Sequence, residues 1–274
     1  MDLMEVKQIL NQISDAVPSG QWSQQLTTAI QRGLAELYLL NPYDDVDGLI
    51  GSRTREAWKF FKDATNQADP DAIEGESAGR LVQAVENVFE FIGKVMVTLP
   101  PDFAFRRRQS QTNRENSAEA IIKAAKAQQL TKAQIAYILA SAEHESDSFN
   151  TLEEYSAGDQ YEGRNDLGNT QSGDGRRFKG RGYVQLTGRR NYTKYAEITG
   201  IALVNLPIIL MNWPALSVFV IVDGMTRGIY TGRRLEEFVN NSKEDFYNAR
   251  QVVNGHDRAE KIAAQATDWL SELD

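Results

Sequence analysis

The segment TKAQIAYILASAEHES, residues 131–146, predicts a well-defined helix and makes the second half of the chain helical in class. Thr131 and Gln134 have the spacing of a capping box, in which each side chain accepts a bond from the other residue's backbone N–H. An apolar stripe at helical spacing follows, formed by Ile135, Ile138, Leu139 and Ala142. Glu145 comes three residues after this stripe, so it is expected at the edge of a buried helical face.

The position of Glu145 suggests acid catalysis. A carboxyl group at the edge of an apolar face is partly desolvated, which disfavours its charged form. A neutral carboxylic acid is what a general acid needs near neutral pH. The ordinary alternative is a glutamate in a salt bridge at a helix end. His144 has no second histidine four residues away, and the only other histidine is His256, so we expect no metal site and no organic cofactor.

A loop rich in acids and glycine follows the helix, and the segment GDGRRFKGRGYVQLTGRRNY, residues 173–192, follows the loop. A glycosidase needs a second carboxylate besides its acid, and the loop offers Glu153, Glu154 and Glu162. Short alternation at 183–186 predicts a small strand or hairpin. Neutral donors and acceptors that suit sugar hydroxyl and acetamido groups stand at Gln185, Thr187 and Asn191.

Composition limits the classes of protein. The chain has 274 residues, a formal net charge of -8 and no cysteine. It is long enough for two modest domains, and it has neither disulfides nor a thiolate nucleophile. The acidic balance argues against nucleic acid as the main partner. Seven basic residues between Arg176 and Lys194 leave a local nucleic-acid patch as a minor alternative.

Two apolar segments could be mistaken for membrane or targeting elements. Residues 201–222 are long enough to span a membrane, but Pro207 and Pro214 interrupt them, so two buried helical segments are expected. The first residues, MDLMEVKQILNQISDAV, predict an amphipathic helix and lack the pattern of a signal peptide. We therefore expect synthesis in the cytoplasm.

The first half of the chain also predicts helices. Apolar stripes at helical spacing occur at residues 6, 10 and 13, at 26, 30, 34 and 37, and at 81, 82, 85, 88 and 89. Ser52 is expected to cap a helix that carries Trp58 and Phe61. Paired prolines and the arginine run at 106–108 then predict a linker. The expected domains are 1–97 and 116–274, with a linker over 98–115.

Residues 27–87 resemble a small three-helix peptidoglycan-binding domain. The residues that carry the resemblance are Val46, Asp47, Gly48, Gly51, Thr54, Ala57 and Phe61. Asp47 and Gly48 suit a tight turn, so the motif is first of all a structural device. Lys62 stands where that family often has glutamine. The resemblance implies wall binding, and a domain that only spaces or docks the second half is the alternative.

Residues 116–274 resemble the catalytic domain of glycoside hydrolase family 19, which comprises chitinases and phage-type endolysins. His144, Glu145 and Ser146 match the family's HET motif. Its GRG-x-x-QL signature, followed by Ser or Thr, is matched by Gly180, Arg181, Gly182, Gln185, Leu186 and Thr187, with Asn191 and Tyr192 after it. The sequence VVNG matches the family's asparagine-glycine motif at Asn254, and Lys261 stands for a basic residue near the carboxylates.

The resemblance implies roles for these residues. Glu145 is the general acid, and Glu154 takes the second carboxylate's place in short-loop members, with Glu153 and Glu162 left open. Thr187 helps to hold the attacking water, and the sugar contacts are Gln185, Asn191 and Asn254. The family is inverting, so the two carboxyl groups are expected roughly 6.5 to 9.5 Å apart.

Together these observations predict a mainly α chain, in which a small three-helix-type domain precedes a lysozyme-like α+β domain with a small β-hairpin. The expected function is hydrolysis of the β-1,4-linked amino sugars of peptidoglycan, acting at the cell wall after release or delivery. A chitinase and a non-catalytic wall-binding or particle protein are the alternatives. The expected partner is peptidoglycan or chitin, with no membrane span, and a monomer is expected.

Overall fold

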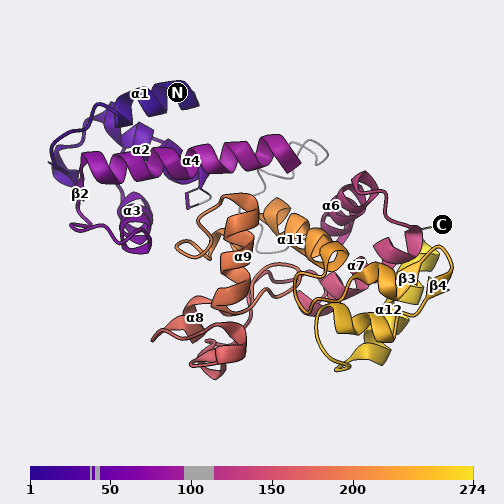
Figure 1. The fold of residues 1–274 in the computed structure, drawn as a ribbon. Helices are drawn as coiled ribbons and strands as arrows, with labels where there is room; N and C mark the ends of the chain where they lie inside the picture. Colours follow the sequence, from indigo (N-terminus) through magenta and orange to yellow (C-terminus); the bar gives the residue numbers. More distant parts are fainter. Residues whose placement is uncertain (38, 41–43, 96–113, 274) are drawn as a thin grey trace. The chain divides into compact units, whose positions relative to one another are not determined.

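The computed structural model describes residues 1–37, 39–40, 44–95 and 114–273 (Figure 1). The chain forms two compact units. The first comprises Met1–Lys94 with Tyr195–Asn212, and the second comprises Val95–Lys194 with Trp213–Asp274. Both units are built mainly from helices, and the strands are two residues long. The predicted mainly α class is therefore confirmed.

The first unit contains helices α1 (Leu3–Leu10), α2 (Gln24–Glu36), α3 (Ser52–Ala64) and α4 (Gly75–Val95), with a short 3-10 turn at Ser19–Gln21. The end of α9 (Arg189–Thr199) and all of α10 (Ile209–Asn212) also belong to it. Strands β1 (Val17–Pro18) and β2 (Ala72–Ile73) pair antiparallel, with Val17 opposite Ile73.

The apolar stripes of the first unit mostly form its core. Trp58 and Phe61 of α3 are buried and stacked, with ring centroids 5.6 Å apart. Two expectations need correction. The N-cap of α3 is Gly51, so Ser52 is the first helical residue. Phe89 is 40% exposed because it turns away from the face of α4 that buries Val85 and Val88.

The VDG turn is built around a buried glutamine, Gln31 of α2. Its amide nitrogen donates to Asp47 Oδ1 and to the Leu49 carbonyl, each at 2.9 Å, and its amide oxygen accepts from the Gly48 N–H at 2.8 Å. Gly48 has φ +76, a conformation that favours glycine. The motif therefore has the structural role expected of it.

Lys62 also has a structural role. Its side chain is fully buried, and its ammonium group lies 2.6 and 2.8 Å from the carboxylate oxygens of Glu74 and donates to the Ala72 carbonyl at 3.2 Å. A buried charge needs such partners. Lys62 thus holds β2 against α3, and its ammonium group is not exposed to a ligand.

The second unit is arranged around α7 (Lys132–Glu145), whose residues from Ala133 to Ala142 are all buried. The capping box of Thr131 and Gln134 is confirmed. Helix α12 (Ala259–Glu272) packs along α7, and α6 (Arg114–Ala127) and α11 (Pro214–Arg227) also contact it (Figure 1). The second unit also contains the first part of α9 and the four-residue helix α8 (Asp174–Arg177). Its described 3-10 turns are Asp159–Tyr161, Asn165–Leu167, Leu235–Glu237 and Asn248–Val252.

The β structure of the second unit differs from the expectation. Strands β3 (Val239–Asn240) and β4 (Lys243–Glu244) form an antiparallel hairpin that the sequence reading did not locate. Of the small strand or hairpin predicted at 183–186, the strand is wrong: residues 182–185 form a turn. Arg181 and Leu186 close this turn as a single antiparallel bridge, with backbone bonds of 3.2 and 2.8 Å. Gly182 (φ 78) and Gln185 (φ 51) are left-handed, so the segment cannot extend.

The prolines of 201–222 act as predicted. Helix α10 ends at Asn212 and α11 begins at Pro214, so two separate helical segments are confirmed. Within the part of the chain that the structure describes, no helix combines the length and apolar character needed to cross a membrane. Most of the predicted linker, including 106–108, lies outside the described residues, although 114 and 115 already belong to α6. The domain boundaries stay a prediction.

Candidate functional site

Glu145 is the last residue of α7, and its partner is an arginine far along the chain. Its Oε1 accepts a bond from Nη1 of Arg250 at 2.7 Å. The Arg250 side chain is 3% exposed and that of Glu145 is 18% exposed. Arg250 lies in the 3-10 turn Asn248–Val252, and its Nε donates to the carbonyl of Asp257 at 3.0 Å. Glu145 is therefore a salt-bridged glutamate at a helix end, which was the stated alternative, and it faces a buried cation instead of the expected apolar border.

The sequence reading missed Arg250. One feature could have indicated it: Arg250 is the only charged residue in the mainly apolar run ARQVV, residues 249–253, which directly precedes Asn254. A buried arginine requires an acidic or carbonyl partner. The sequence around Arg250 could therefore have indicated a buried ion pair, but it could not have identified Glu145 as the partner.

Further cations surround His144. Burial lowers the pKa of His144, the Glu145 carboxylate raises it in part, and Arg250, Lys261 and Arg258 lower it further. The structure thus brings Lys261 within electrostatic range of the end of α7, as the resemblance implied. A neutral imidazole is favoured here, because both burial and neighbouring cations oppose its charge.

The turn after α7 has an unusual backbone. Asp147, Ser148 and Phe149 have φ values of 49, 59 and 64. This is a run of left-handed backbone conformations, which residues other than glycine rarely adopt. The Ser148 N–H donates to the Glu143 carbonyl at 2.7 Å. Phe149 is fully buried, and its ring lies 6.0 Å from that of Tyr183. Packing and hydrogen bonds therefore hold this strained turn in one conformation.

Glu154 is held by four hydrogen bonds. Its Oε1 accepts from Ser156 Oγ at 2.8 Å, from Gln160 Nε2 at 2.9 Å and from the Tyr161 hydroxyl at 2.9 Å. Its Oε2 accepts from the Gly180 N–H at 3.0 Å. A carboxylate has about four acceptor sites, so these donors fix the side chain closely.

The other two acids of the loop have different partners. Glu153 Oε1 lies 3.1 Å from Arg181 Nε and 3.4 Å from Lys179 Nζ. Glu162 accepts from the N–H groups of Gly173 and Gly175 at 2.7 and 2.8 Å, and so caps the N-terminus of α8. Glu153 is thus engaged in an ion pair and Glu162 in a cap.

Glu154 and the neutral residues of the signature form one cluster. A Cβ placed on Gly180 would lie 2.6 Å from Gln185 Oε1 and 3.2 Å from Glu154 Oε2, so both side chains border this glycine. Thr187 Oγ1 donates to the Gln185 carbonyl at 2.8 Å. Asn191 Nδ2 donates to the Thr187 carbonyl at 2.9 Å. The tertiary structure therefore joins the predicted Glu154, Gln185, Thr187 and Asn191.

Asn254 belongs to the other cluster, with Glu145. It is exposed, and its backbone N–H donates to the carbonyl of Arg250 at 3.0 Å. One side-chain contact ties the segments of the two clusters. The hydroxyl of Tyr155 donates to Asp147 Oδ2 at 2.9 Å. Asp147 comes two residues after Glu145 and Tyr155 directly follows Glu154, so this bond draws the two carboxylate-bearing segments together.

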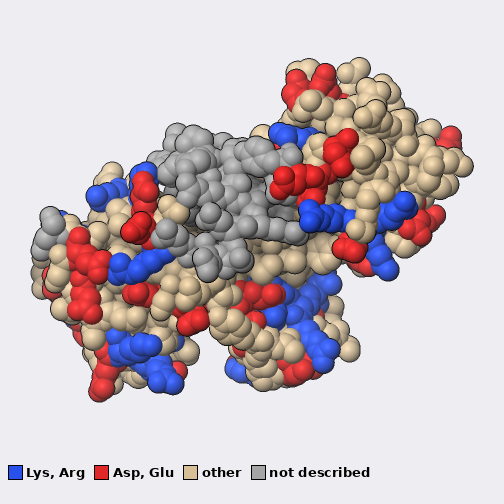
Figure 2. Space-filling model, turned by 180° about the vertical axis from the view of Figure 1, so that it is seen from behind, with Lys and Arg blue, Asp and Glu red and all other residues tan. Residues whose placement is uncertain are grey.

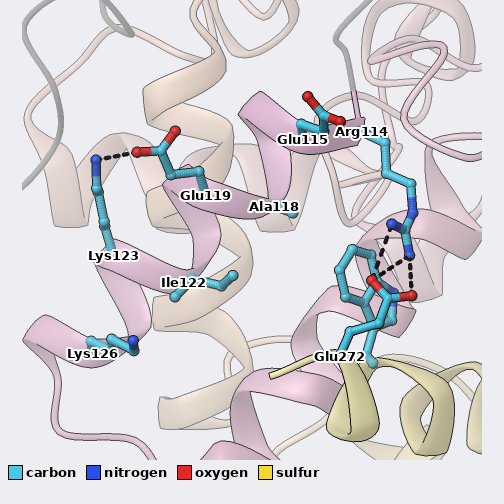
Figure 3. Close-up of a pocket in the computed structure, with 9 residues that line it drawn as sticks. Arg114, Glu115, Ala118, Glu119, Ile122, Lys123, Lys126 and Glu272 are labelled. Carbon is cyan, nitrogen blue, oxygen red and sulfur yellow. Dashed lines mark hydrogen bonds and ion pairs between the residues drawn. The ribbon is translucent and has the colours of Figure 1, made fainter. Parts of the chain in front are cut away.

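A pocket of about 420 Å³ lies elsewhere in the second unit, between α6 and α12. Figure 3 shows Arg114 bonded to Glu272 at its rim, and the Arg114 guanidinium also lies 3.8 Å from the ring centre of Trp269. The lining residues are Arg114, Glu115, Ala118, Glu119, Ile122, Lys123, Lys126, Trp269 and Glu272. None of them is a site residue predicted from the sequence.

Among the residues with described positions, no group of three or more His, Asp or Glu side chains is arranged to hold a metal ion. Figure 2 shows acidic and basic side chains interspersed on the face in view, outside the grey atoms. In the basic segment, Arg176 pairs with Asp159 and Arg189 with Asp174. These pairs reduce the cationic character of the proposed nucleic-acid patch.

No family model matches the chain. The chain is similar to the crystal structure of chitinase C from Streptomyces griseus HUT6037, at 20% identity, with 62% of this chain and 89% of that chain covered and a TM-score of 0.44. A mutant of chitinase C gives the same values. Both of these solved structures are of chitinase C.

Proposed function

We propose that the chain is a glycoside hydrolase that cleaves β-1,4 bonds between amino sugars. The observation that carries the proposal is the arrangement of two glutamates. Glu145 is paired with buried Arg250, Glu154 is fixed beside Gln185, and the bond from Tyr155 to Asp147 links their segments. Two positioned carboxyl groups are the minimum equipment of this reaction.

In the proposed mechanism Glu145, which pairs with Arg250 as a carboxylate in the free protein, first takes up a proton from solvent and then gives it to the glycosidic oxygen as the C–O bond breaks. The carboxylate left behind is stabilised by Arg250, whose guanidinium already lies 2.7 Å from Oε1. Glu154 takes a proton from the water that attacks the anomeric carbon. Its Oε2 accepts one described bond, from the Gly180 N–H at 3.0 Å, so a second acceptor position on this oxygen can receive the proton of the water. Thr187 would help to hold the water.

The sugar chain would lie against the neutral side chains of both clusters. Gln185 and Asn191 come from the Glu154 cluster, and Asn254 comes from the loop that carries Arg250. Amide groups can donate to and accept from hydroxyl and acetamido groups. An inverting outcome is part of the proposal and follows from the resemblance in the sequence.

Peptidoglycan is the proposed substrate, with chitin as the alternative. The resemblance of residues 27–87 to a peptidoglycan-binding domain favours peptidoglycan. The contacts of the first unit limit where wall could bind, because Gln31 and Lys62 are fully buried in structural roles. The enzyme would act at the cell wall after release or delivery, as a monomer.

The test compares matched glutamate variants of the full chain. Wild type, Glu145→Gln, Glu154→Gln and Glu162→Gln are assayed for release of reducing ends from purified sacculi and from colloidal chitin. The first two substitutions should abolish release, whereas Glu162→Gln should retain it because Glu162 only caps α8. NMR of the first product would give its anomeric form. Full activity of Glu145→Gln would remove the mechanism.

A non-catalytic wall-binding protein is the second candidate. The observation in its favour is that Glu153, Glu154 and Glu162 each have hydrogen-bonding or ionic partners. Such a protein would sediment with sacculi but release no reducing ends from them. The same assay therefore distinguishes the two functions.

A further inference from the structure

We propose that the ring of Tyr155 is a stacking platform for one sugar of the substrate, placed between the segments that carry Glu145 and Glu154. This inference rests on the proposed function and adds a substrate-positioning residue to it. The sequence signature does not include Tyr155. The role follows from the exposure, the anchoring and the position of its side chain.

The Tyr155 side chain is both uncovered and anchored. The residue is 79% exposed, the highest exposure of any aromatic residue whose surroundings the structure describes. Its hydroxyl nevertheless donates to Asp147 Oδ2 at 2.9 Å, and this bond is the main reason that its pKa is raised. The faces of the Tyr155 ring are therefore accessible to a ligand, while the hydrogen bond of its hydroxyl group restricts the position of the ring.

The anchor itself is rigid. Asp147 begins the left-handed run at φ 49, and the third residue of that run, Phe149, is fully buried. The ring of Phe149 packs edge-on against Trp269, with centroids 6.3 Å apart. Asp147 therefore cannot move without disturbing the core of the second unit. Ordering the ring before the ligand arrives reduces the entropy lost on binding.

The position of the ring suits a sugar chain. Tyr155 directly follows Glu154, and its bond reaches the residue two after Glu145. The faces of a pyranose ring are apolar C–H surfaces, and tyrosine offers a large, stiff contact area with only two side-chain torsions. The hydroxyl end remains polar and wet. A β-linked amino sugar could thus lie on Tyr155 while its linkage reaches the carboxylates.

The other exposed tyrosine of the second unit differs in this respect. Tyr247 is 45% exposed, but its ring is stacked on that of His256, with centroids 5.4 Å apart and planes at 22°. One of its faces is therefore already covered by a side chain. Tyr155 combines an anchored hydroxyl with a much more exposed ring.

The kinetic test uses the full chain and a soluble hexamer of N-acetylglucosamine. Tyr155→Ala should raise KM about tenfold, the effect of losing roughly one aromatic contact, and any fall in kcat should be shared by Tyr155→Phe, because both variants lose the bond to Asp147. Tyr155→Phe keeps the ring and loses only the tie to Asp147, so its KM should rise less. Phe60→Ala removes an exposed aromatic of the first unit and serves as the control. An unchanged KM for Tyr155→Ala would overturn the proposal.

A binding test separates this inference from the proposed function. The variant Glu145→Gln and the double variant Glu145→Gln/Tyr155→Ala, in which hydrolysis is expected to be blocked, are measured for retention on insoluble chitin and on sacculi. If wild type releases no product from either polymer, the proposed function fails. Weaker retention of Tyr155→Ala would then still support the platform, and equal retention on both polymers would refute it. Circular dichroism should be the same for all variants, since the ring contributes little to the core.

Discussion

Replacement of Arg250 by methionine tests the ion pair that organises the candidate site. Methionine is close in length and apolar, so it can fill the buried space while it removes the charge and both hydrogen bonds. The side chain of Arg250 is 3% exposed, and it bonds Glu145 at 2.7 Å and the Asp257 carbonyl at 3.0 Å. Arg250→Met therefore leaves a carboxylate without its cation.

The expected loss of stability can be estimated from burial. Breaking a buried ion pair by removing one partner destabilises a protein by 3–5 kcal/mol. Glu145 is 18% exposed, so water can solvate part of its charge after the substitution. The lower end, about 3 kcal/mol, is therefore expected for Arg250→Met. Activity should fall as well, because the carboxylate formed during proton transfer loses its stabilising partner.

Urea unfolding followed by near-UV circular dichroism would measure this loss. Arg176→Met is the matched control, because Arg176 also pairs with an acid but is 71% exposed, and it should unfold like wild type. In a double-mutant cycle, Glu145→Gln should lower the cost of Arg250→Met, since the carboxylate is no longer charged. A loss below about 0.5 kcal/mol, or strict additivity in the cycle, would refute the reasoning.

Three further predictions concern other parts of the chain. The folded-state pKa of His144 is lowered, so below about pH 6.5 the unfolded chain binds more protons than the folded one. Its contribution to stability is complete above that pH and is lost as pH falls, and His144→Gln should flatten this slope in urea titrations at pH 5 and 8. Gly180→Ala would place a Cβ 3.2 Å from Glu154 Oε2 and should lower kcat at least about tenfold, with unchanged circular dichroism. Gln31→Ala leaves the Gly48 N–H without its acceptor, and a loss of about 2 kcal/mol in unfolding free energy is expected. A loss within experimental error would show that the hydrogen bonds of Gln31 do not stabilise the VDG turn.

Local patterns in the sequence were sufficient for several of the helices, although not for α6, α9 or α12. The capping box at Thr131 and the stripe after it predicted α7, and Pro214 marked the start of α11. These features depend on interactions between residues three or four apart, which the order of residues specifies directly. The VDG turn was recognisable for the same reason, because Gly48 must supply a positive φ.

Alternation alone misled at residues 183–186. Tyr183, Val184 and Leu186 are all buried, so the segment has no polar and apolar face. Gln185 adopts a left-handed conformation that only its surroundings impose. A run of four residues is too short for periodicity to separate a strand from a buried turn.

By itself the sequence determined that the chain is mainly helical, where several of its helices lie, and which residue types could supply acid, base and sugar contacts. Only the tertiary structure decided that Glu145 pairs with Arg250, that Glu154 borders Gln185, and that Tyr155 reaches Asp147. The physical reason is the range of the interactions involved. Helix formation follows from near neighbours, whereas the partner of a charged side chain is set by packing between distant segments, as for Glu145 and Arg250, which are 105 residues apart.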